Sequence, residues 1–500
     1  MIFKLMICCF VLFFLHDFLI QKGFIMSQKL KLNKIQSFAV MSCVLLAPCM
    51  LSVKGAQAGG FGLREVSAAG EAVSLAGAAA GAAGLGSIYW NPATLTQFDG
   101  LQLGVNSTLI VPYSEMKNQP PTSAGYNAYS NFLGGSSSSG NIGIIGNVPS
   151  GQMTYRLSPD LWLGLSLSVP YGQSTKADSS YVGRTYGSTT KVASVEVEPM
   201  LAYRLSDTVS LGAGIRYLNF SSRYSSAFPG NATPSQWSVL GIAGDGEALG
   251  FSLGATFKPW AQTEIGIGYR SEAAVHLGGN FFGGAALASN FGGSAALATA
   301  TLDQPVKLNL SLPQSVTLGL KQGIDERWTL LGAFEYVQWS TLKAPSVSYA
   351  NNGSSPVASW TAGQAHPALQ TIPLYYRDAW FTSVGTEYRY SPDLLLRGGL
   401  AYEKNPLGLN SKSARLPDFN RIWASLGLTY QIAPQWSLDL AYLHIFMLGD
   451  HLKIDPTNTG YSPALGAVGL GTLDAKVDAR VDIISVGLTY QFTTGTSKQK

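Results

Sequence analysis

Apolar and polar residues alternate along most of the chain beyond Leu101. Between Ile484 and Phe492 an apolar side chain occupies every second position, and small or polar residues fill the positions between. The same period of two recurs in the segments 209–217 and 436–446. This period is typical of a β-strand with one apolar face. We therefore predict an all-β chain.

Fourteen such segments can be counted between Leu101 and Phe492. Their connections alternate between tight turns and long loops rich in Gly, Ser and Asn. An even strand count with short turns at one rim and long loops at the other is typical of outer-membrane barrels. The pattern predicts a 14-stranded antiparallel transmembrane β-barrel over residues 101–492. A soluble sandwich would give the same alternation with its apolar face inside, and the number and length of the strands favour the barrel.

Composition supports a surface that largely avoids water. Only 12% of the residues are charged, against about 25% in an ordinary soluble domain. Beyond residue 58 there is no aliphatic run of the roughly 20 residues that a membrane helix needs. Because only helices and closed barrels satisfy the backbone within lipid, these two facts together favour the barrel.

Residues 1–58 are predicted to be a secretory leader that is removed after Ala58. Met26 is the favoured start, because lysines, an apolar run and the small residues at Ala56 and Ala58 follow it in order, as a signal peptide requires. A start at Met1, with a membrane anchor in residues 1–20, is the alternative. Cleavage would remove all four cysteines and six of the 33 basic residues, but only one of the 29 acidic residues. The basic balance therefore reflects targeting and does not indicate nucleic acid.

The segment 59–100 differs from everything that follows it. It is rich in Gly and Ala and is nearly uncharged after Glu71. Gly costs about 1 kcal/mol per interior helical position, so this segment needs an enclosure to hold its shape. We expect it to be an N-terminal hatch that plugs the barrel. Residues 493–500 would form a short C-terminal tail.

Charged residues within the strands are expected to point into the barrel. A charge facing lipid at mid-membrane costs up to a few kcal/mol, so these residues should face inward and pair, bracing the wall and the hatch. Ligand contact by one of them is the alternative. By alternation the inward set is Glu196, Glu198, Arg216, Glu264, Arg270, Glu272, Glu335 and Arg397.

Aromatic residues gather beside the predicted tight turns. Rings with a polar edge prefer the headgroup level of a membrane, so the recurrence predicts an interfacial girdle. Aromatics that merely end their strands are the alternative. The members are Tyr155, Trp162, Tyr203, Phe257, Trp260, Trp328, Tyr390, Tyr430 and Trp436.

With these features in view, the chain resembles the FadL-type family of outer-membrane transporters for long-chain fatty acids and other hydrophobic compounds. The resemblance covers nearly all of residues 59–492. It depends on short motifs in a shared order: Gly60-Phe61 with Glu65, Asn91-Pro92-Ala93, Tyr269-Arg270-Ser271-Glu272, Leu310-Ser311-Leu312-Pro313, Trp339-Ser340, Asp378-Ala379, Leu416-Pro417-Asp418 with Arg421 and Trp423, and Tyr490-Gln491-Phe492.

The resemblance implies diffusion-driven uptake and several residue roles. Arg223 and Lys343 correspond most nearly to the family's head-group cations at the outer mouth, although both are equally compatible with plain surface solvation. Phe61 matches an apolar residue that places the N-terminus in the ligand pocket, and Asn91, Pro92 and Ala93 form the hatch motif. Proline is confined to strand edges, ends or bulges. At Pro170 and Gly172 the strand could simply end, whereas the family suggests an inward kink and a lateral exit into lipid.

The predicted function is passive transport of long-chain fatty acids or similar hydrophobic compounds across the bacterial outer membrane. The alternatives are an aromatic hydrocarbon channel on the same fold, a water-filled porin and an adhesin or structural role. We expect no enzyme activity, catalytic residue, metal or cofactor. Gly250–Gly254 matches the GxSxG pattern, but that motif needs a strand-turn-helix context that is missing here. We expect a monomer surrounded by outer-membrane lipid and lipopolysaccharide, whose partner is a hydrophobic small molecule.

Overall fold

The structure, a computed structural model, describes residues 60–119, 135–228, 238–283, 302–349, 368–372, 374–461 and 472–492. These residues all belong to one compact unit, Val53–Lys500. The predicted leader, residues 1–58, and the predicted tail, residues 493–500, lie outside the described residues.

The β-segments form a single antiparallel sheet. Those of the first half are β1 (Leu101–Asn118), β2 (Ser138–Asn141), β3 (Gly146–Arg156), β4 (Leu161–Ser168), β5 (Gly172–Lys176), β6 (Thr189–Arg204), β7 (Val209–Phe228), β8 (Ser238–Trp260), β9 (Thr263–Arg270) and β10 (Ala273–Gly283). Those of the second half are β11 (Leu302–Leu312), β12 (Ser315–Gly323), β13 (Trp328–Val337), β14 (Ser346–Tyr349), β15 (Ala368–Thr371), β16 (Ala379–Ser391), β17 (Leu394–Glu403), β18 (Arg421–Ala433), β19 (Trp436–Met447), β20 (His451–Ile454) and β21 (Leu473–Phe492).

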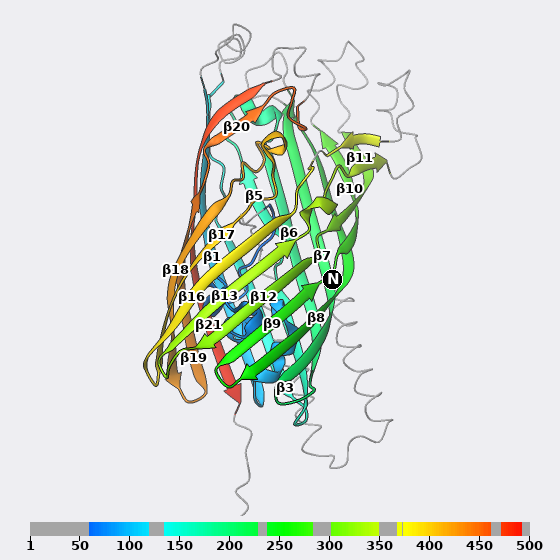
Figure 1. Ribbon diagram of the computed structural model, residues 1–500. Coiled ribbons are helices and arrows are strands. Elements are labelled where there is room, and N and C mark those ends of the chain that lie inside the picture. The colour runs from blue at the N-terminus through cyan, green and yellow to red at the C-terminus, as the bar shows by residue number, and fades with distance from the viewer. Residues whose placement is uncertain are drawn as a thin grey trace, which may run out of the picture. The chain divides into compact units, whose positions relative to one another are not determined.

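The sheet closes on itself because β1 pairs with β3 on one side and with β21 on the other. Several neighbouring segments, such as β9 with β10 and β11 with β12, are successive pieces of one long strand. Counted in this way, the closed antiparallel barrel has 14 strands, which confirms the predicted fold class. The strands run obliquely around the barrel in Figure 1.

The outer face of the barrel carries large apolar side chains at alternate positions. On β7 and β8, Leu211, Ile215 and Leu249 are 48%, 64% and 69% exposed. Residues on the opposite face of the same strands, such as Ser210 and Ser252, are buried. On these two strands the apolar face therefore points outward, the opposite of a soluble sandwich. Among the described residues, no helix has the length and apolar character needed to cross a membrane.

Most of the aromatic residues beside the tight turns are exposed on this outer face, as an interfacial girdle requires. Trp260, Trp328 and Tyr390, for example, are 64%, 44% and 66% exposed. Trp162 departs from the prediction because its ring is fully buried inside the barrel. There the indole Nε1–H donates to the backbone oxygen of Phe98 at 2.8 Å, and the guanidinium of Arg204 lies 4.7 Å from the ring centroid. These polar partners hold the side chain inward.

Residues 60–99, called here the N-terminal segment, form short helical turns rather than strands. The turns are α3 (Ala68–Glu71), η1 (Ala78–Ala80), η2 (Gly84–Gly86), α4 (Ser87–Trp90) and η3 (Pro92–Gln97). They contact strands around the barrel: α3 contacts β18, β19 and β21, η1 contacts β9 and β12, and η3 contacts β4, β6, β7 and β8. Nearly all of these residues are buried. Figure 1 shows the segment in blue among the strands.

The wall makes room for this segment with glycine. A Cβ atom added to Gly266 would collide with the backbone oxygen of Ala79, and one added to Gly268 would collide with that of Trp90. The backbone of the segment therefore lies directly against β9. Small residues on both sides allow a close approach that larger side chains would block.

Candidate functional site

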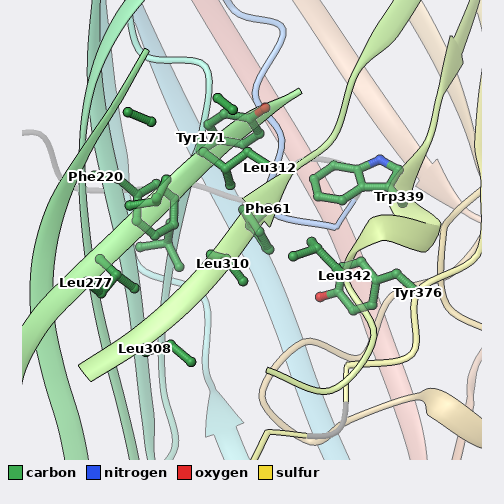
Figure 2. Packing of buried hydrophobic residues seen from close by; sticks show 14 of the residues in the cluster. Phe61, Tyr171, Phe220, Leu277, Leu308, Leu310, Leu312, Trp339, Leu342 and Tyr376 are labelled. Atoms are coloured by element: carbon green, nitrogen blue, oxygen red, sulfur yellow. The ribbon is translucent and has the colours of Figure 1, made fainter. Parts of the chain in front are cut away.

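An apolar cluster inside the barrel surrounds Phe61, the second described residue. Phe61 is only 2% exposed. Its ring centroid lies 5.1 Å from that of Trp339, 5.8 Å from Tyr171, 6.2 Å from Phe220 and 6.3 Å from Tyr376. Figure 2 shows these rings converging on Phe61. Aromatic rings at these separations contribute packing energy beyond their buried area.

Different parts of the barrel supply this cluster, called here the Phe61 cluster. Strand β7 contributes Phe220, η6 (Trp339–Thr341) contributes Trp339, and β11 contributes a row of leucines. Its buried members are Phe61, Tyr171, Val192, Leu218, Phe220, Ala248, Ala273, Val275, Leu277, Val306, Leu308, Leu310, Leu312, Val337, Trp339, Leu342, Val347, Tyr376, Ala379 and Leu407. These side chains are aliphatic or aromatic, and such surroundings favour an apolar molecule.

Polar contacts anchor the chain on both sides of Phe61. The backbone N–H of Gly60 donates to Oδ2 of Asp418 at 3.1 Å. The guanidinium of Arg64 pairs with Glu335 and with Glu403, each at 2.7 Å. The sequence places Asp418 in a family motif and predicts that Glu335 points inward, but it did not indicate that Arg64 would pair with acidic residues of the strands. The one sign of that residue was a basic side chain in a segment otherwise nearly free of charge.

Four of the predicted inward charges meet in one buried cluster. Arg216 pairs with Glu196 at 2.8 Å, and Arg270 pairs with Glu198 at 2.9 Å and also with Glu196. The four side chains are at most 7% exposed. Nη1 of Arg270 also donates to the backbone oxygen of Tyr89 at 2.8 Å, so the cluster binds the wall to the N-terminal segment.

Arg397 makes a separate pair of contacts on the other side of the barrel. It pairs with Glu387 at 3.0 Å and with Asp439 at 3.2 Å. The predicted inward position of Glu272 is wrong, because its side chain is exposed on the outer face. Ser271 and Glu272 lie between β9 and β10, and the buried positions change there from even-numbered to odd-numbered residues. A strict period of two cannot anticipate this irregularity.

Neither of the predicted head-group cations points into the Phe61 cluster. Arg223 is exposed on β7, and its guanidinium carbon lies 4.0 Å from the centroid of the Phe282 ring. Lys343 is also exposed, and its backbone oxygen accepts from Leu374 N–H at 2.9 Å. The buried side chains of β7 nearest to Arg223 are those of Leu218 and Phe220 before it and of Ser225 and Ala227 after it.

The motif Asn91-Pro92-Ala93 fastens the N-terminal segment to the barrel. Nδ2 of Asn91 donates to the backbone oxygens of Ala79 at 2.7 Å and Ala255, on β8, at 2.9 Å. Its Oδ1 accepts from the N–H of Ala93 at 3.0 Å and caps η3. One buried amide thus satisfies three backbone groups, and Pro92 fits the first position of the following turn.

The wall is interrupted where β4 gives way to β5. Backbone N–H of Leu63 donates to the oxygen of Pro170 at 2.8 Å, and N–H of Gly172 donates to the oxygen of Phe61 at 2.9 Å. The kinked residues therefore pair with the N-terminal segment instead of with β3. Pairing of β4 with β3 covers only Gly151–Arg156 of β3, whereas β1 pairs with β3 from Gly146 onward. Beyond the kink, the chain resumes pairing with β6 as β5.

The preceding β3 residues, 146–150, have a ladder partner on the β1 side only. Pro149 lies in this stretch, where the lack of a backbone N–H is tolerated.

The closed barrel with apolar outer faces and an enclosed apolar cluster defines the class: a multi-pass outer-membrane β-barrel.

The chain belongs to the family described as outer membrane protein transport protein (OMPP1/FadL/TodX), whose model matches residues 50–492. It is therefore an outer-membrane transport protein, a member of a family of transport channels rather than enzymes. The long-chain fatty acid transport protein of Escherichia coli (strain K12) is 24% identical over 463 residues, covering 86% of this chain and 95% of that protein.

Two solved structures share the fold. A Pseudomonas aeruginosa FadL homologue has a TM-score of 0.72 at 22% identity, covering 87% of this chain and all of that chain (100%). The Ralstonia pickettii toluene transporter TbuX has a TM-score of 0.59 at 18% identity, covering 85% of this chain and 98% of that chain. These similarities agree with the barrel derived above.

Proposed function

We propose that this protein carries hydrophobic compounds, foremost long-chain fatty acids, passively across the bacterial outer membrane. The observation that supports this most is the Phe61 cluster, a set of buried apolar side chains inside the barrel. Each methylene buried from water contributes about 0.8 kcal/mol, so an alkyl chain that replaces Phe61 among these rings and leucines would be held there. The names of the curated relatives, long-chain fatty acid transport proteins, agree with this substrate class.

In this proposal residues 59–100 act as a hatch and residues 101–492 as the barrel around it. Ligand would be captured at the extracellular mouth, where the exposed Arg223 and Lys343 can attract anionic head groups. A shift of the chain around Phe61 would then open space for the ligand within the Phe61 cluster. The contacts of Gly60 with Asp418 and of Arg64 with Glu335 and Glu403 would resist that shift.

The ligand would leave sideways through the interrupted wall at residues 169–172. Phe61 and Leu63 bond to the kinked strand itself, so a displaced N-terminal segment would free the edges of this gap. Lateral exit suits an apolar molecule, because the molecule passes from protein to lipid without re-entering water. A monomer suffices for this path, since each barrel encloses its own Phe61 cluster.

Uptake of aromatic hydrocarbons is the second candidate. The four aromatic rings around Phe61 would pack against a small aromatic ligand as well as against an alkyl chain. The toluene transporter TbuX has the same fold. An adhesin or structural role stays a prediction of another class.

Uptake and flux together test these functions. Cells that lack their own fatty acid transporter should gain uptake of radiolabelled oleate when they produce the wild-type protein. Liposomes containing the protein should not swell in isotonic sugar, because the hatch leaves no water-filled pore. Uptake of toluene without oleate would favour the aromatic channel. Rapid sugar flux would indicate a porin, and the absence of all three would contradict a transport role for this barrel.

A further inference from the structure

Arg415 lies in the segment between β17 and β18, outside the membrane-spanning strands, and its guanidinium is held against the inner wall. Nη1 donates to the backbone oxygen of Ser225 at 2.7 Å, and Nη2 donates to Oγ of Ser226 at 2.6 Å. The backbone oxygen of Arg415 itself accepts from Oγ1 of Thr175 at 2.9 Å. Contacts with β5 and β7 therefore fix both ends of the residue.

Arg415 differs from five other guanidinium groups inside the barrel. Arg64, Arg216, Arg270, Arg397 and Arg421 each pair with a glutamate or an aspartate. Arg415 has no carboxylate within ion-pairing distance among the described residues. Burial lowers the pKa of Arg415 to about 10, which leaves the group charged at neutral pH. An inward cation that lacks a counter-ion is costly unless an anion reaches it.

The unpaired cation lies at the edge of the Phe61 cluster. Its guanidinium carbon is 5.8 Å from the centroid of the Tyr224 ring. Tyr224 in turn packs against the Phe61 cluster. The polar and apolar halves of an amphiphile thus have adjacent counterparts, a guanidinium on one side of Tyr224 and an aromatic chamber on the other. Arg223 and Lys343 cannot fill this role in the structure, because both are exposed.

We propose that Arg415 binds the carboxylate of an amphipathic ligand whose alkyl chain occupies the Phe61 cluster. This inference depends on the proposed function and adds that the preferred substrate is a hydrophobic anion rather than a neutral hydrocarbon. A guanidinium is suited to the task because its fixed fork of donors matches the two oxygens of a carboxylate. Two of those donors now bond to Ser225 and Ser226, so an entering carboxylate would share or replace these neutral acceptors.

Paired ligands and variants test the assignment. Binding of oleate and of uncharged oleyl alcohol to the purified full-length protein in neutral detergent would be measured by calorimetry. In Arg415→Gln, oleate affinity should fall about tenfold or more, the effect of losing one charge-assisted hydrogen bond. Affinity for oleyl alcohol should stay within about twofold. Arg415→Lys should restore part of the oleate affinity, and the exposed Arg389→Gln serves as the control.

The outcomes separate this inference from the function on which it depends. Equal losses for oleate and oleyl alcohol in Arg415→Gln would show a structural role and overturn the proposal. So would unchanged oleate binding, or a selective loss in Arg223→Gln instead. If the wild-type protein binds neither ligand, the proposed fatty acid function fails as well. If it binds both ligands and Arg415→Gln changes neither affinity, the function stands and only the role of Arg415 fails.

Discussion

Single residues in this protein matter most where charge is buried. Glu196, Glu198, Arg216 and Arg270 lie almost wholly out of water, yet each faces an opposite charge. Such clusters gain little stability overall, because desolvation offsets the attraction. Removing one partner is different, since it leaves another charge uncompensated. The cluster therefore fixes one position of the N-terminal segment through the bond of Arg270 to Tyr89.

We predict that Arg270→Gln destabilises the folded barrel by about 3–5 kcal/mol, the usual cost of breaking a buried ion pair. The variant leaves both glutamates short of a cation. Samples are heated to a series of temperatures before gel electrophoresis. The measurement is the temperature at which the band of the folded barrel disappears, compared with the wild type. Arg389→Gln removes an exposed arginine and should leave that temperature unchanged. A transition for Arg270→Gln equal to that of the control would contradict the bracing role of the cluster.

At the scale of elements, the barrel and the N-terminal segment are shaped for each other. Strand β9 presents Gly266 and Gly268 where the backbone of η1 and α4 lies against it, and β4 bends at Pro170 to bond with Phe61 and Leu63. The wall lacks side chains at the two glycines and is interrupted at Pro170, and both features let the N-terminal segment contact the wall directly.

Side-chain volume tests the fit of the segment directly. Gly268→Val should displace α4, because any Cβ there meets the backbone oxygen of Trp90. We expect a lower unfolding temperature and measurable sugar flux in liposome swelling. The matched variant is Gly278→Val on β10, where a Cβ would meet nothing within 4 Å. Similar behaviour of the two variants would mean that the segment does not need this close approach.

The interrupted wall gives a second prediction at this scale. Deleting residues 169–171 should let β4 continue directly into β5 and pair with the free edge of β3, so that the gap closes. Uptake of oleate should then fall about tenfold or more, the scale of removing a main path. Binding to the purified protein should fall less than uptake, because the deletion removes one ring of the Phe61 cluster, that of Tyr171. Binding and uptake that both match the wild type would exclude lateral exit at this place.

The sequence allowed the strands to be predicted because their period of two is set by the membrane outside and the segment inside. The alternation placed Glu196, Glu198, Arg216 and Arg270 on the inner face, where they are buried, although it says nothing about which of them meet or which pairs form. It failed at Glu272, where two residues between β9 and β10 reverse the phase. Arg415 was beyond sequence reasoning, because its position depends on how a long connection folds against β5 and β7.

At the scale of the whole molecule, the distribution of apolar side chains explains why the protein resides in a membrane and supports the proposed function. Exposed leucines, isoleucines and aromatics cover the outer face, a pattern that a soluble protein would not tolerate. A second, separate apolar region, the Phe61 cluster, is enclosed by the same wall. The hydrophobic effect therefore holds the barrel in lipid and, in the proposed function, also draws an apolar ligand out of water into the Phe61 cluster.

Short-range quenching of Trp339 by a brominated fatty acid tests the central claim that the Phe61 cluster receives the ligand. Titration of purified protein with dibromostearate should quench tryptophan fluorescence saturably, and Trp339→Phe should remove most of that quenching while unbrominated oleate competes in the wild type. If Trp339→Phe shows the same saturable quenching as the wild type, the ligand binds elsewhere on the barrel and the Phe61 cluster is not its site.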